Sequence, residues 1–76
     1  MKALVLGTAD DVRGFALAGV RGRVCASAED LRTAAASVED GEVGLVILSP
    51  GLRLLAPEVF DSLAARRQAP FAVVLP

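Results

Sequence analysis

The sequence predicts a small α/β domain built on an open, four-stranded parallel sheet. Two short, almost wholly apolar runs, residues 3–6 and 43–48, are typical of parallel strands that are covered on both faces. Stretches with apolar residues at helical spacing alternate with the predicted strands, and the connections between them are short. This alternation favours a parallel sheet over separate helical and strand layers.

The first predicted unit is a buried strand, Ala3–Leu6, followed by a helix. Thr8 and Asp11 have the spacing of a capping pair, in which the threonine oxygen accepts a backbone N–H and the aspartate favours the positive end of the helix. We therefore expect the helix to begin near Ala9, with Gly19 just past its end. Its apolar positions recur at helical spacing: Val12, Phe15, Ala16 and Gly19.

The second unit is a weaker strand and a longer helix. The strand is predicted over Arg23–Ala26, polar at its start as an edge strand would be. Ser27 and Asp30 form a second capping pair that opens the helix, and Asp40–Gly41 ends it. The buried stripe of this helix is predicted to be Leu31, Ala34, Ala35 and Val38.

The second half of the chain supplies the central strand and the last helix and strand. Val43–Leu48 is the most apolar run and is predicted to be central. After a break at residues 49–51, Leu52–Ala56 fits either one or two helical turns or a loop with exposed leucines. We expect a helix over Pro57–Arg67 with both arginines in its last turn, and a final strand over Phe71–Leu75. The buried positions of this helix are predicted to be Phe60, Leu63 and Ala64.

Right-handed crossovers fix how these elements are layered. The expected strand order is 2-1-3-4, as in flavodoxin-like and receiver-like domains. The first helix then covers one face of the sheet, and the other two helices cover the opposite face. Strands three and four are left uncovered on the first helix's side, so we expect a bare apolar patch there.

Length and composition indicate a single domain, residues 1–76, with apolar surface to spare. The chain has 76 residues, of which 54% are hydrophobic, with a net charge of −1. A chain of this size buries only about 60% of its unfolded surface, so part of the apolar surplus is expected to meet a partner or a second copy. The near-zero charge gives no reason to expect nucleic acid or anionic lipid as a partner. One cysteine, no secretory signal and no membrane-length apolar run favour a cytoplasmic protein.

Catalytic and cofactor-binding patterns are mostly missing, and we expect no cofactor, no metal and no enzymatic activity. Gly7 is a lone glycine without the glycine pattern of a phosphate-binding loop. The Asp10–Asp11 pair resembles the acidic corner of a receiver domain, but Leu48 and Ser49 stand where the phosphoacceptor aspartate would be, so helix capping is favoured. Cys25 is expected to be buried and structural, because the sequence has no histidine to activate it.

Three segments of the chain carry a family resemblance. Gly14–Val20, in the order G-F-x-L-A-G-V after a strand and a short acidic turn, resembles the F subunit of the V-type (archaeal-type) ATPase or ATP synthase. The apolar strand Val43–Leu48 and the final P-x-x-V-V-x-P segment, Pro70–Pro76, are also similar to that family. Members of the family usually continue into a linker and a C-terminal helix that this sequence does not contain. The resemblance therefore covers the N-terminal globular domain only.

The resemblance implies a non-catalytic central-stalk (rotor) component, peripheral to the membrane within the ATPase complex. Its globular domain would bind the long coiled coil of the stalk's D subunit, among the other subunits, and help couple ATP turnover to ion (proton) transport. Alternatives are a degenerate receiver-like signalling or scaffold domain without a phosphoacceptor, and a small nucleotide-binding protein. Open α/β sheets bind ligands at the carboxyl ends of their strands. The expected partner-binding residues are Phe15 and Leu17, with core packing and helix capping as the alternative role for their segment, and Leu52, Leu54 and Leu55.

Overall fold

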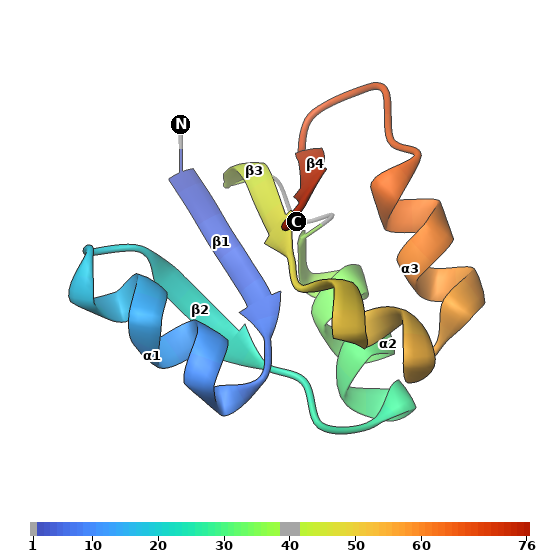
Figure 1. Ribbon diagram of the computed structural model, residues 1–76. Coiled ribbons are helices and arrows are strands. Elements are labelled where there is room, and N and C mark those ends of the chain that lie inside the picture. Colours follow the sequence, from blue (N-terminus) through green and yellow to red (C-terminus); the bar gives the residue numbers. More distant parts are fainter. Residues whose placement is uncertain (1, 39–41) are drawn as a thin grey trace.

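The computed structural model describes residues 2–38 and 42–76 (Figure 1). Its strands form one parallel sheet in the order β2-β1-β3-β4, so the predicted fold class and strand order are confirmed. The elements in chain order are β1 (Lys2–Gly7), α1 (Ala9–Leu17), β2 (Arg21–Val24), α2 (Ala28–Val38), β3 (Val43–Leu48), the 3₁₀ helix η1 (Pro50–Leu54), α3 (Pro57–Ala64) and β4 (Phe71–Val74).

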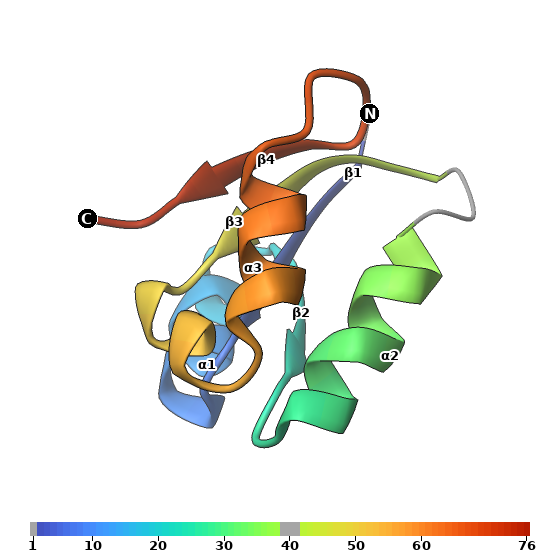
Figure 2. The same ribbon diagram turned by 90° about the vertical axis from the view of Figure 1, so that its right-hand side faces the viewer.

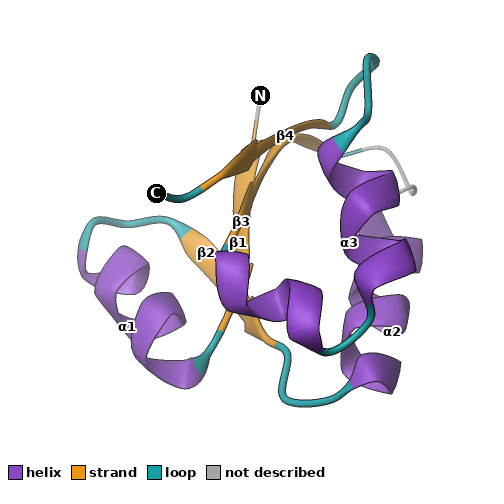
Figure 3. Ribbon diagram, turned by 45° about the vertical axis from the view of Figure 1, so that its right-hand side comes forward, coloured by secondary structure: helices purple, strands orange, loops and turns teal. Residues whose placement is uncertain are grey.

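The helices form two unequal layers around the sheet. Figure 3 shows α1 alone on one side and α2 with α3 on the other. In Figure 2, α2 and α3 stand side by side in front of the sheet, and these two helices also contact each other. The main core lies between this pair of helices and the sheet, and its fully buried large side chains are Leu6, Leu31, Val38, Val46, Leu48 and Leu52.

Both ends of α1 form as the sequence predicts. The backbone N–H of Asp11 donates to Thr8 Oγ1 at 3.3 Å, which satisfies one of the free donors of the first turn. Gly19 has a φ of +85°, a left-handed conformation that glycine adopts without strain. The next N–H, of Val20, donates back to the carbonyl oxygen of Phe15 at 3.0 Å. The helix is therefore closed by local hydrogen bonds at each end.

The second capping pair is also present. The N–H of Asp30 donates to Ser27 Oγ at 3.1 Å, and the N–H of Ala26 donates to Asp30 Oδ2 at 3.0 Å. The preceding strand begins earlier than predicted, because the tight turn at Gly19 lets Arg21 pair with β1 at once. The predicted helix end at Asp40–Gly41 lies outside the described residues.

The third helix is shorter than predicted. It ends at Ala64, so Arg66 and Arg67 lie beyond its last turn, and the prediction that they sit in that turn is wrong. The guanidinium of Arg66 instead donates to the carbonyl oxygens of Pro70, at 3.0 Å, and Ala69, at 3.2 Å. Arg66 therefore stabilises the connection between α3 and β4 and does not cap the helix.

The buried side of α3 is also narrower than predicted. Phe60 and Leu63 are buried in the core as expected, but Ala64 is exposed, so the prediction that it is buried is wrong. Because the helix ends at Ala64, no further turn follows to press this position against the sheet.

Candidate functional site

Three residues meet at the carboxyl edge of the sheet, where β1 and β3 end side by side. This is the switch point of an open α/β sheet, because the chain leaves β1 toward one edge and β3 toward the other. A Cβ placed on Gly7 would lie 3.1 Å from Asp11 Cβ and 3.2 Å from Ser49 Cβ. The glycine therefore leaves room for both side chains to close over the strand ends. Among the described residues, Ser49 is the buried polar side chain, 7% exposed.

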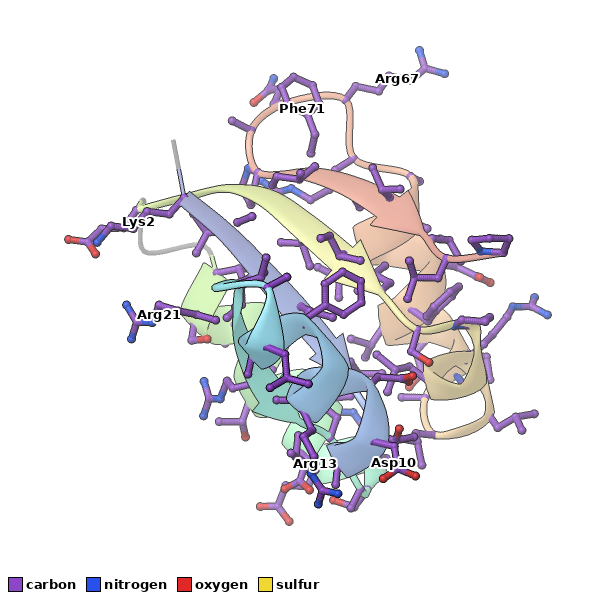
Figure 4. All side chains as sticks on the ribbon, turned by 60° about the vertical axis from the view of Figure 1, so that its left-hand side comes forward. Lys2, Asp10, Arg13, Arg21, Arg67 and Phe71 are labelled. Atoms are coloured by element: carbon purple, nitrogen blue, oxygen red, sulfur yellow. The ribbon has the colours of Figure 1, made fainter. Side chains whose placement is uncertain are left out.

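The carboxylate at this corner is satisfied by its neighbours. The Ser49 side chain, and then the side chain and backbone N–H of Thr8, donate hydrogen bonds that hold the pKa of Asp11 below its ordinary value of 3.8. Asp10 lies apart from this contact, because its side chain is 94% exposed and its carboxylate is 4.0 Å from Arg13 Nη1 (Figure 4). The arrangement caps α1, as the capping hypothesis predicts, and it also joins the helix to the end of β3, which the sequence did not predict.

Metal chemistry has no set of ligands at this corner. Across residues 2–38 and 42–76, no group of three His, Cys, Asp or Glu side chains could hold an ion. The corner offers one carboxylate and one hydroxyl, which already bond to each other. We call this contact of Asp11 with Ser49 the carboxyl-edge clasp.

The predicted contact leucines separate into exposed and buried residues. Leu54 is 89% exposed, but Leu52 is 1% exposed and belongs to the core, so the expectation of exposed leucines is wrong for Leu52. Leu55 is half-buried against the same core. The 3₁₀ turn explains the split: three residues per turn point Leu52 and Leu55 inward and Leu54 outward.

The two predicted contact residues of α1 are both accessible, to different degrees. Leu17 is 88% exposed at the last position of the helix, whereas Phe15 is half-buried. Because α1 begins at the carboxyl edge and runs back, Leu17 lies toward the amino edge of the sheet. Leu54 follows the carboxyl end of β3. The structure therefore brings these two exposed leucines to opposite edges.

A bare apolar surface lies on the α1 side of β3 and β4, as the strand order predicts. Val5, Ile47 and Val73 are register neighbours and share that face, as do Leu45 and Phe71. Val5 is fully buried where α1 packs on β1 and β2, but Phe71 and Val73 are each 49% exposed on β4. Figure 4 views this face, with α1 in front of one half of the sheet and Phe71 beside the other.

A groove at the amino edge gathers basic side chains that sequence reasoning did not bring together. It is lined by parts of β1, β2 and α2, and the strand register brings Arg21 next to Leu4 there. Lys2 Nζ lies 3.4 Å from Glu42 Oε2, and Arg23 Nη1 donates to Ser37 Oγ at 2.9 Å. Arg21 and Arg23 lie two residues apart on β2, but only the sheet register shows that Lys2 of β1 lines the same groove. Lys2 and Arg23 already have partners, whereas Arg21 lies exposed beside them.

Cys25 is buried just after β2, as predicted. The residue is 3% exposed, and its Sγ lies 4.0 Å from the carbonyl oxygen of Arg23. Burial raises the pKa of the Cys25 thiol, and the nearby Asp30 carboxylate raises it further. The start of α2 therefore does not activate it, and the side chain acts as a small core residue.

No family model matches this chain, and no curated protein matches it. Within the described residues, no helix is both long and apolar enough to cross a membrane.

Proposed function

We propose that this domain is a non-catalytic central-stalk component of a V-type ATPase or ATP synthase, similar to the N-terminal domain of the F subunit. The observation that carries the proposal is the resemblance of the G-F-x-L-A-G-V segment, Gly14–Val20, together with that of Pro70–Pro76. In this role the domain is cytoplasmic and peripheral to the membrane. It binds the coiled coil of the D subunit, turns with it, and helps couple ATP turnover to ion translocation.

Two features of the structure support a binding role over a catalytic one. The carboxylate of Asp11 accepts hydrogen bonds from Ser49 and Thr8, which suits a capping role. Apolar side chains, including Phe71 and Leu54, are instead held at the surface by a rigid sheet and a 3₁₀ turn. Such side chains gain free energy when a partner removes them from water.

Co-expression with the cognate D subunit tests the proposal. We expect the two chains to co-purify, and Leu54→Asp to weaken the complex while the isolated domain stays folded, since Leu54 is 89% exposed. Leu17→Asp is the matched variant at the opposite edge, and comparing the two shows which edge faces the coiled coil. If the folded coiled coil does not retain the folded wild-type domain, the stalk assignment is wrong.

One observation favours a second candidate function, a receiver-like scaffold domain. Ser49 stands at the end of β3 and bonds to Asp11, the position and partner expected of a receiver phosphoacceptor. Introducing a carboxylate by Ser49→Asp would place it beside the carboxylate of Asp11. The two would repel each other unless a cation binds between them. The receiver hypothesis predicts that Mg²⁺ raises the melting temperature of Ser49→Asp and leaves that of Ser49→Asn unchanged. An equal response of both variants would remove this candidate.

A further inference from the structure

The bare surface on β3 and β4 has the dimensions of one α-helix. Neighbouring strands lie about 4.8 Å apart, so two strands offer a width of about 10 Å, which equals the diameter of a helix with its side chains. The four residues of Phe71–Val74 extend for about 13 Å, the length of roughly nine helical residues. We call this surface the β3–β4 slot: the side chains of Leu45, Ile47, Phe71 and Val73 on the α1 side of the sheet.

The exposed area of the slot suits a short helix better than a second copy of the domain. Phe71 and Val73 are each 49% exposed, and Leu45 and Ile47 are partly buried. Together they present apolar surface on the order of 300 Å². A stable dimer buries about 800 Å² on each partner, so this surface is too small to hold two copies together. An amphipathic helix of two or three turns would cover it.

Charges at the two ends of the slot favour one helix direction. Asp10 lies in the first turn of α1, at the carboxyl edge of the sheet, and Arg67 lies on the connection that leads into Phe71, at the amino edge (Figure 4). Asp11 adds a second carboxylate near the former, against the single cation of Arg13. Arg67 has no hydrogen bond or ion pair within the described part of the chain. A helix carries partial positive charge at its N-terminus and negative charge at its C-terminus, so these ends suit a helix that runs antiparallel to the strands, as α1 does.

We infer that the β3–β4 slot binds an amphipathic α-helix of a partner protein, which lies beside α1 and runs antiparallel to the strands. The partner helix presents apolar residues at i, i+3 or i+4, and i+7 toward Phe71 and Val73. The slot is a binding face beyond those of the proposed function. Its binding of a helix does not depend on whether the domain binds the stalk coiled coil. The helix would complete the second layer that α1 forms only over β1 and β2.

A fused helix tests the inference without any natural partner. A designed twelve-residue helix with a leucine stripe is joined after Pro76 by a flexible Gly-Ser linker, because β4 ends at the edge where such a helix must start. The linker supplies a millimolar effective concentration. We expect the folding equilibrium constant, measured by urea denaturation, to rise about tenfold or more relative to the same helix with glutamines in place of leucines.

Slot variants and an oligomerisation measurement decide between the possible outcomes. Val73→Asp should abolish the gain in folding stability. The milder Val73→Thr, which keeps the β-branched shape, should reduce that gain, and it provides the test if Val73→Asp folds poorly. A gain that survives both substitutions would mean that the helix binds elsewhere, and no gain at all would also overturn the inference. Sedimentation equilibrium of the unfused domain provides the third test. A micromolar dimer that Val73→Thr dissociates would assign the slot to a second copy instead.

Discussion

The two faces of the sheet differ in how they are stabilised. On the α2 and α3 side, large side chains such as Leu6, Val46 and Leu48 are 0% exposed. On the opposite side, α1 contains no buried residue, and Val5 is the fully buried side chain beneath it. The helix α1 therefore packs through half-buried side chains such as Val12 and Phe15, and Val12 lies close to Gly22 of β2. Most of the apolar burial that stabilises the domain lies on one face.

The strongest test of this difference compares one substitution on each face. We expect Leu48→Ala to cost about 3 kcal/mol of unfolding free energy, because it leaves a cavity at a fully buried position. Phe71→Ala removes a larger side chain but should cost about 1 kcal/mol or less, because half of that side chain is already in water. Urea denaturation of the two variants gives both values. Equal losses would mean that the β3–β4 slot is already covered in the isolated protein.

A pair of glycine substitutions examines how α1 is held. A Cβ on Gly22 would lie 2.7 Å from Val5 Cγ1 and 2.8 Å from Val12 Cγ1, so β2 and α1 meet there without space for a methyl group. We expect Gly22→Ala to destabilise the domain by about 1–3 kcal/mol. The control is Gly14→Ala within α1, where nothing lies within 4 Å and alanine should stabilise by about 0.5–1 kcal/mol. Thermal melts that move in the same direction for both variants would contradict this packing.

The elements that the sequence predicted well are those with local signals. Capping pairs such as Thr8 with Asp11 act within one helical turn, and the apolar run Val43–Leu48 is bounded by its own sequence neighbours. The strand order followed from right-handed crossovers, which need only the order of the elements. From that order alone, the bare half of the α1 face was also predictable.

The details that the sequence did not predict depend on long-range register. The contact of Asp11 with Ser49 requires β1 and β3 to end together, which the hydrogen bond from the N–H of Ser49 to the carbonyl oxygen of Leu6 fixes at 3.0 Å. The burial of Leu52 depends on how the 3₁₀ turn is placed over the core, and a leucine-rich segment of five residues has no periodicity that shows its inner side. The residues of this chain that a partner would contact also have no local sequence signal, because exposed leucines and core leucines look alike in a sequence.

The smallest expected effect concerns the clasp that joins the two faces at the carboxyl edge. The pKa of Asp11 is lower in the folded state than the ordinary value of 3.8, because Ser49 and Thr8 donate hydrogen bonds to the carboxylate. Above that value the carboxylate is ionised in both states, and its stabilising contribution is fully present. As the pH falls below 3.8 the unfolded chain takes up a proton first, so the contribution shrinks and is lost once the pH passes below the folded pKa.

Asp11→Asn should therefore reduce stability near neutral pH and flatten its loss between pH 5 and pH 2, roughly the window of carboxylate titration. Asp10→Asn is the matched control, since it removes one carboxylate from the same helical turn at a side chain that is 94% exposed. Urea midpoints measured at several pH values give the comparison. Because the Asp11 carboxylate is near the surface, solvent limits the size of the effect, and the shape of the pH curve is the decisive readout. An unchanged curve for Asp11→Asn would show that the clasp does not contribute to holding α1 against β3.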